Sequence, residues 1–202
     1  MAADALNGHD SFPDFPVCEP PSDSVSALEF TPKTAPFNGL CAASWDQTVQ
    51  VWEVDSSSKT ATPKSLQKMA APLLDASWNG DGNRIYASDC TGSVFEWNLD
   101  ANHVSQRKCH TAGVRACRWL WTPKTPLLMT ASWDKTLCYA ADVLYPLAVV
   151  ITKAITKCAI SSDGLLFAYA LGYDWSMGHE HCDHRLKPQI FFHPCLEDMR
   201  PK

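Results

Sequence analysis

Residues 41–52 read C-A-A-S-W-D-Q-T-V-Q-V-W, and this stretch decides the fold because it is repeated along the chain. Residues 129–137 carry the same phrase as M-T-A-S-W-D-K-T-L, and residues 87–97 carry a weaker copy, A-S-D-C-T-G-S-V-F-E-W. The copies recur with a period of about 44 residues, which lies in the range of known structural repeats. The sequence therefore contains an internal repeat, and each copy is one unit of the fold.

Each copy has the composition of a strand, a tight turn and a second strand. Small and apolar residues form the first strand, Ser-Trp-Asp forms a polar turn, and the alternating run T-V-x-V-W forms the second strand. A period of about 44 residues with this content is typical of WD repeats, whose units are the blades of a β-propeller. We therefore predict an all-β fold, a WD-repeat β-propeller.

Four blocks of this kind fit between two tails, so the propeller is predicted to be incomplete, with about four blades. The predicted blocks cover residues 23–55, 68–100, 109–139 and 153–195, with an irregular junction at 140–152. Residues 1–22 are predicted to be a flexible tail that contains a candidate closing strand, and residues 196–202 form a second tail. The polar stretch 55–67 is predicted to be a surface loop.

The third block departs from the pattern of the first two. Trp52 and Trp97 close the first and second blocks six residues after the turn, whereas the third block has Ala140 at this position. A buried tryptophan would fill the space between neighbouring blades, and we expect Trp52 and Trp97 to do so. The third block is therefore expected to pack less tightly and to end on an unpaired edge.

The composition limits the classes of function. The chain has 202 residues, of which 46% are apolar and 19% charged, as in an ordinary globular domain. A net charge of −5 argues against broad binding to nucleic acid. The nine cysteines are scattered singly, which favours free thiols over disulfides. The sequence has neither a secretory signal nor an apolar run of about 20 residues, so a nuclear or cytoplasmic protein without a membrane span is expected.

Several phrases resemble one family. The order S-W-D-x-T-V-x-x-W-E-V, S-W-D-K-T-L, C-Y-x-A-D-V-x-Y-P-x-A-V-V and F-A-Y-A-x-x-Y-D-W-S-x-G-H-E is similar to that of the WD-repeat messenger-RNA export factors of the nuclear pore. The resemblance covers most of the chain and implies that about three central blades of the family's propeller are absent. The gaps fall between Leu137 and Cys138 and between Val150 and Ile155. An open or strained arc is therefore expected, with exposed apolar faces around residues 144–151.

The resemblance implies a non-enzymatic adaptor in the export of messenger RNA from the nucleus. The implied partner is a nuclear-pore protein that carries a GLEBS-type segment, and weak RNA binding is a further expectation; no cofactor and no small-molecule substrate are expected. The implied location is the nucleus, at the nuclear pore or envelope, and also the cytoplasm. Two alternatives remain open: a WD-repeat scaffold of the mitotic spindle checkpoint, and a truncated product without binding activity.

The candidate site residues fall into two groups. The first group carries the repeat structure and consists of Trp45, Asp46, Trp52, Trp97, His110, Trp133, Asp134, Asp174 and Trp175. Within it, His110 and Asp134 match a histidine and an aspartate that are hydrogen-bonded across each blade of the family, a structural rather than a catalytic pairing. The second group consists of candidate partner-binding residues, which are Trp45, Arg115, Arg118, Trp133 and Lys135.

Two further patterns were weighed as sites. The second block has Met69 and Thr91 where this family's histidine and aspartate would stand, and the joint loss favours a structural role for that pair. Residues 179–184, H-E-H-C-D-H, together with His193 and Cys195, hold enough potential ligands for Zn²⁺. Their spacing matches no structural zinc pattern, so a polar loop without metal is predicted. No nucleotide-binding or hydrolase motif is present, and no catalytic residue is predicted.

Overall fold

The computed structural model describes residues 15–120, 126–140, 149–150, 154–160, 166–173, 180 and 189–194. These residues form antiparallel β-strands, and no α-helix occurs in the described ranges. Among the same residues, none forms a helix that is both long and apolar enough to cross a membrane. The predicted all-β fold is therefore confirmed.

The strands form four separate sheets in chain order. Sheet 1 contains β1 (Val25–Phe30), β2 (Gly39–Ser44), β3 (Thr48–Asp55) and β4 (Thr60–Lys68). Sheet 2 contains β5 (Leu73–Trp78), β6 (Arg84–Asp89), β7 (Ser93–Asn98) and β8 (His103–Lys108). Sheet 3 contains β9 (Val114–Leu120), β10 (Leu127–Ser132), β11 (Thr136–Ala140) and β12 (Val149–Val150). Sheet 4 contains β13 (Ile155–Ile160), β14 (Leu166–Leu171) and β15 (Gln189–Pro194).

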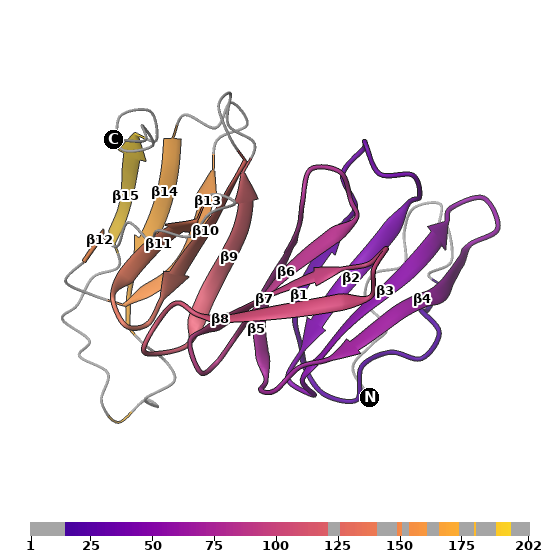
Figure 1. Cartoon of the computed structure of the whole chain (residues 1–202), viewed down its shortest axis with the longest axis horizontal. Helices are drawn as coiled ribbons and strands as arrows, with labels where there is room; N and C mark the ends of the chain where they lie inside the picture. The colour runs from indigo at the N-terminus through magenta and orange to yellow at the C-terminus, as the bar shows by residue number, and fades with distance from the viewer. Residues whose placement is uncertain are drawn as a thin grey trace, which may run out of the picture.

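The sheets are arranged in a row, and each sheet packs face to face against the next. Strand β5 contacts β1 and β2, β9 contacts β5 and β6, and β13 contacts β9 and β10. In Figure 1 sheet 1 lies at the right, and sheets 3 and 4 overlap at the left. The described strands therefore form an open arc of propeller blades rather than a closed ring, as the sequence predicted.

Alternating side chains give every sheet two faces. We call the face toward the next sheet in chain order the front face and the opposite one the back face. Cys41, Val49 and Val51 on the front face of sheet 1 pack against Ile85 and Trp97 on the back face of sheet 2. The core of the arc thus consists of layers between neighbouring sheets, and burial of these apolar side chains holds the sheets together.

The outer strands were not predicted correctly from the sequence. The stretch 55–67 was expected to be a loop, but most of β4 lies within it, and β8 lies beyond the predicted end of the second block. In β4 only Ala61 is buried, and in β8 no residue is buried. Strands with both faces largely in water carry no apolar alternation, so the period-2 signal is absent.

Sheet 3 also differs from the expectation of an unpaired outer edge. Strand β12, although only two residues long, pairs with β11 through Thr136 and Leu137. Of the expected apolar patch at residues 144–151, only residues 149–150 are described. Val149 and Val150 therefore provide part of the outer strand of sheet 3.

The two closing tryptophans occupy equivalent positions but different surroundings. Trp52 pairs with Leu40 and Trp97 pairs with Ile85, whereas Ala140 takes the same register position opposite Leu128. Trp97 packs between sheets 1 and 2 as predicted. The prediction for Trp52 is wrong because its cluster lies on the back face of sheet 1, and the N-terminal segment covers that face rather than another blade.

Candidate interaction surface

The turn between β2 and β3 is fixed by its own side chains. The Asp46 carboxylate accepts hydrogen bonds from the Thr48 backbone N–H at 2.9 Å and from the Thr48 hydroxyl at 2.6 Å. It also accepts one from the Ser22 backbone N–H at 2.8 Å. Gln47 has a φ of 73°, a left-handed conformation that such a tight turn requires. The turn therefore presents the neighbouring Trp45 from a rigid frame.

The turn between β10 and β11 has the same construction. The Asp134 carboxylate accepts hydrogen bonds from the Thr136 backbone N–H at 2.9 Å and from the Thr111 backbone N–H at 2.8 Å. Lys135 has a φ of 70°, as Gln47 does in the first turn. Burial alone would raise the pKa of Asp134, but hydrogen bonds from Thr136 and Thr111 lower it. The ionised carboxylate is thus the form that holds this turn.

His110 lies beside this turn. Its Nδ1 atom is 3.2 Å from Asp134 Oδ2 and 2.7 Å from the Thr136 hydroxyl, and its Nε2 atom is 2.8 Å from the Thr130 hydroxyl. The His110 side chain is fully buried. Burial lowers the pKa of His110 more than the attraction of Asp134 raises it. The pairing is therefore a structural hydrogen bond between a neutral imidazole and a carboxylate.

Acidification is expected to weaken this part of the fold. The unfolded chain binds a proton at His110 near its ordinary pKa of 6.5, while the folded chain resists protonation. The stability that His110 contributes is therefore present above pH 6.5 and is lost as the pH falls below this value. Urea unfolding at about pH 7.5 and about pH 5.5, roughly one unit on either side of the ordinary histidine pKa, should show this loss.

The control for this pH dependence is His110→Gln, which keeps polar contacts but cannot be protonated. Its free energy of unfolding should change less between the same two pH values than that of the unchanged protein. An equal loss in both proteins would assign the pH dependence to other groups.

Sheet 2 has a different turn at the same place. The carboxylate lies two residues earlier, at Asp89, and accepts hydrogen bonds from the backbone N–H groups of Thr91 and Ser93 at 2.9 and 2.8 Å. Gly92 has a φ of 101° and takes the position of Gln47 and Lys135. Met69 is buried in the layer between sheets 1 and 2. The loss of the histidine and the aspartate is thus compensated by an apolar contact and a shifted carboxylate.

These equivalent turns lie on one rim of the arc. Trp45 is exposed over 44% of its surface, and Lys135 is exposed as well. Trp133 is half-buried, and its ring packs directly on Gly113. A Cβ atom at position 113 would lie only 2.6 Å from this ring. Gly113 was not singled out in the sequence, although its lack of a side chain is what permits this contact. The structure thus brings Trp45, Trp133 and Lys135 to the same rim, with the turn of sheet 2 between the two tryptophans.

The two candidate arginines lie on β9 and contact sheet 2. The Arg118 guanidinium lies 2.8 Å from the Asp75 carboxylate and 3.2 Å from the Ala76 carbonyl oxygen, so it joins sheet 3 to sheet 2. Arg115 donates a hydrogen bond to the Leu74 carbonyl oxygen at 3.2 Å, across the same layer. Within this chain both arginines therefore bridge two sheets, and their contact with a partner stays a prediction.

Arg118 is part of a partly buried charge cluster that spans three sheets. Burial alone would lower the pKa of Arg118, but the charges of Asp75 and Glu29 raise it. Burial raises the pKa of Glu29, whose carboxylate accepts a hydrogen bond from the Trp78 backbone N–H at 3.0 Å. Because Glu29, Asp75 and Arg118 come from β1, β5 and β9, this cluster ties together the first strands of three consecutive sheets.

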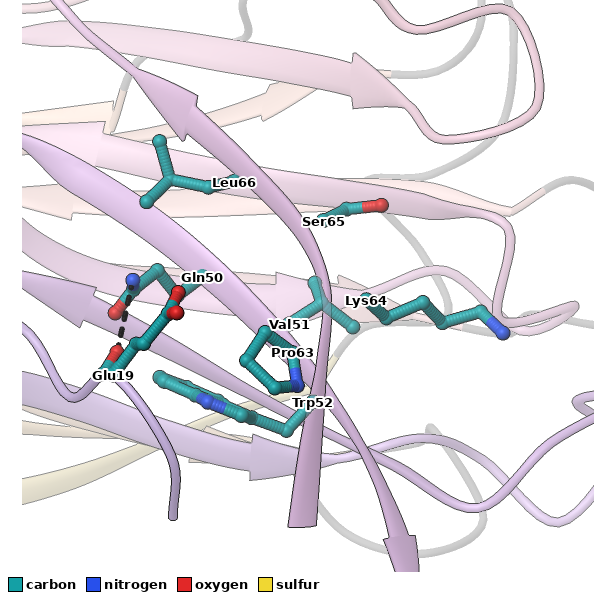
Figure 2. A pocket seen from close by; sticks show the side chains of 8 residues that line it. All are labelled: Glu19, Gln50, Val51, Trp52, Pro63, Lys64, Ser65 and Leu66. Carbon is teal, nitrogen blue, oxygen red and sulfur yellow. Dashed lines mark hydrogen bonds between the residues drawn. The ribbon is translucent and has the colours of Figure 1, made fainter.

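A shallow hollow of about 200 Å³ lies on the back face of sheet 1. Figure 2 shows Trp52 beside Pro63, with Gln50 donating a hydrogen bond to the Glu19 carbonyl oxygen at 3.2 Å. The Trp52 indole N–H donates a hydrogen bond to the Cys18 carbonyl oxygen at 2.7 Å. The hollow is therefore formed where the N-terminal segment crosses the sheet, and it holds no cluster of catalytic groups.

The remaining candidates lie largely outside the described residues. Asp174 and Trp175 are not described, and of the possible zinc ligands at 179–184 only Glu180 is. Within the described ranges, no group of three or more histidine, cysteine, aspartate or glutamate side chains is arranged to hold a metal ion. The prediction for residues 179–184 therefore stays a prediction.

Comparisons with known proteins agree with this arrangement of sheets. A family model described as WD domain, G-beta repeat, matches residues 102–139, which span β8 to β11. Protein Rae1 of Drosophila melanogaster is 27% identical over 333 aligned positions, which cover 94% of this chain and 96% of that protein. The mRNA export factors of Xenopus tropicalis and Danio rerio are each 36% identical, over 73% and 72% of this chain.

The lengths of these alignments show that the chain is short for its class. The alignment with Rae1 is longer than the 202 residues of this chain, so it contains long gaps in this chain. The chain spans about half the length of the vertebrate relatives, since the alignments cover 45% of each of them.

The repeated sheets, the rim turns and the family match define the chain as a WD-repeat protein with an open propeller fold. The matched family model describes a structural repeat rather than a catalytic domain. Within this class, the chain is a shortened homologue of the Rae1 and mRNA export factor proteins.

Proposed function

We propose that the chain is a non-enzymatic adaptor in the export of messenger RNA, and that it binds a GLEBS-type segment of a nuclear-pore protein. The observation that carries this proposal is the homology to mRNA export factors together with an exposed tryptophan on a rigid rim turn. The corresponding location is the nucleus, at the nuclear pore or envelope, with passage through the cytoplasm.

The rim has the properties of a peptide-binding surface. Exposed tryptophans are frequent energetic anchors of protein interfaces. The Asp46 hydrogen bonds hold the turn that carries Trp45, so little conformational entropy is lost when a partner binds there. Lys135 adds a positive charge to the equivalent turn of sheet 3, which suits a partner segment with acidic residues.

The expected result is that a GLEBS-type peptide binds the full chain and that Trp45→Ala weakens binding at least tenfold, or about 1.4 kcal/mol. Isothermal titration calorimetry with the peptide and with a scrambled peptide measures this. Leu66→Ala is the matched control, because Leu66 is also exposed, at 56% against 44% for Trp45, but lies on the back face of sheet 1. Equal binding of both peptides by folded protein would contradict the proposal.

The other two functions lead to different outcomes. A truncated product without binding activity would bind neither peptide although its circular dichroism shows folded β-structure. A spindle-checkpoint scaffold would select a GLEBS-like segment from a checkpoint protein over one from the pore. The similarity to mRNA export factors favours export. With a net charge of −5, any contact with RNA is expected to be weak and sensitive to salt.

A further inference from the structure

The two ends of the arc carry apolar faces that no other described sheet covers. On the back face of sheet 1, the cross-strand pairs place Phe30 beside Leu40 and Leu40 beside Trp52. Phe30 is 58% exposed, and Leu28 on the same face is 64% exposed. This end of the arc thus presents large apolar side chains from β1 to solvent, as interaction sites do.

The front face of sheet 4 is the opposite end of the row. Phe191 stacks on Tyr169 with a centroid distance of 5.6 Å, and Tyr169 packs toward sheet 3, so Phe191 lies on the back face. Its neighbours Ile190 and Phe192 therefore lie on the front face, because successive side chains of a strand alternate. Each of the two is 70% exposed.

The front face of sheet 4 is equivalent to a face that is buried elsewhere in the chain. Cys158 pairs with Tyr169 in sheet 4 as Cys117 pairs with Thr130 in sheet 3. This alignment places Ile190 and Phe192 at the positions of two residues of β11. These are Leu137 and Tyr139, which are only 1% and 9% exposed because they pack against sheet 4.

The back face of sheet 1 is equivalent to the back face of sheet 2. Trp78, Ile85 and Trp97 occupy the register positions in sheet 2 that Phe30, Leu40 and Trp52 occupy in sheet 1. In sheet 2 this row is buried against sheet 1. The two ends of the arc are therefore the two unpaired halves of one interface, and the chain forms this type of interface three times internally, between sheets 1 and 2, 2 and 3, and 3 and 4.

We propose that the occupant of each end is a second copy of this chain. The front face of sheet 4 of one copy packs on the back face of sheet 1 of the other, and the same contact forms at the second junction. Two four-sheet arcs then close into a two-fold ring of eight sheets, which is within the range of about four to eight blades known for propellers. Ring closure buries both apolar ends, whereas a head-to-tail contact without closure would produce a filament.

The N-terminal segment leaves room for this contact. Cys18 donates a backbone hydrogen bond to the Ala61 carbonyl oxygen in β4 and accepts one from Trp52. The segment therefore covers the part of the face near the outer strands. Leu28 and Phe30 on β1, the first strand, stay exposed. In the internal layers the first strands of neighbouring sheets contact each other, as β5 contacts β9.

The experiment measures the mass of the full chain by light scattering at micromolar concentration, without a partner peptide. We expect the mass of two chains. The variant Ile190→Asp/Phe192→Asp and the variant Phe30→Asp should each be unable to close the ring and should have a lower mean mass than the unchanged protein. Because the substituted side chains are exposed within one copy, the melting temperature of each variant's monomer should stay close to the unchanged value. Trp45→Ala on the rim is the control and should keep the mass of two chains.

A mixture of the two variants tests the head-to-tail arrangement. Phe30→Asp keeps the front face of sheet 4, and Ile190→Asp/Phe192→Asp keeps the back face of sheet 1. One intact junction can therefore form between the two variants, and a species with one chain of each should appear. A monomer of the unchanged protein at all concentrations would overturn the proposal. Masses that grow without limit would overturn ring closure, and failure of the mixture to associate would overturn the pairing of front with back face. Peptide binding by Trp45 is a separate readout, so either proposal can fail alone.

Discussion

Trp97→Ala is expected to unfold the protein. Trp97 is 1% exposed and packs in the layer between sheets 1 and 2, where its ring contacts residues of both. Truncation of a buried tryptophan to alanine costs about 3–5 kcal/mol. This is comparable with the lower part of the total stability of about 5–15 kcal/mol that a domain has. Urea unfolding followed by circular dichroism should show the variant largely unfolded in buffer.

Trp45→Ala and Trp52→Ala are the matched comparisons. Trp45 is exposed, so its removal should change the free energy of unfolding by little. Trp52 is buried only against its own sheet and the N-terminal segment, so its truncation should cost less than that of Trp97. Equal losses for Trp52 and Trp97 would show that packing between sheets is not the dominant contribution.

Asp75→Ala should produce a second large loss of stability. The Asp75 side chain is 1% exposed and accepts hydrogen bonds from the Cys117 backbone N–H at 2.9 Å and from Arg118 at 2.8 Å. Its removal leaves a partly buried guanidinium without its main partner charge. Removal of one member of a buried ion pair costs about 3–5 kcal/mol. Thermal and urea unfolding of the variant measure this loss.

The double variant Asp75→Ala/Arg118→Met separates the charge effect from the packing effect. With both charges removed, no unpaired charge stays between sheets 2 and 3, so stability should partly recover. Asp75→Asn is a milder control, because the amide oxygen still accepts the Cys117 hydrogen bond. The loss of stability in the double variant is compared with the summed losses of the single variants Asp75→Ala and Arg118→Met. If it exceeds that sum, Arg118 does not depend on Asp75 in the way described.

The repeat phrase predicted the inner and middle strands of the sheets, but not the outer ones. Residues 41–52 carry a recognisable apolar pattern because most side chains of β2 and β3 are buried. Strand β8 has no buried residue and is held mainly by backbone hydrogen bonds to β7. Backbone pairing does not depend on side-chain type, so it leaves little trace in a sequence.

The candidate site was predictable where it depends on local sequence. Asp134 lies two residues before the threonine that it binds, and the repeat itself shows this spacing. The role of Arg118 depends on Asp75, a residue more than forty positions away in another sheet. The signal that could have revealed it is an aspartate inside the apolar run L-L-D-A-S-W, because a buried charge requires a partner.

The arrangement of the sheets in a row also determines how the protein opens. Where repeats touch only their neighbours, the free energy of the whole is approximately a sum of unit terms and nearest-neighbour terms, as in a one-dimensional chain. Sheets 2 and 3 each have two neighbours, and sheets 1 and 4 each have one in a single copy. In a single copy the terminal units therefore fray independently of each other, so loss of order at β15 does not have to reach the turn that carries Trp45.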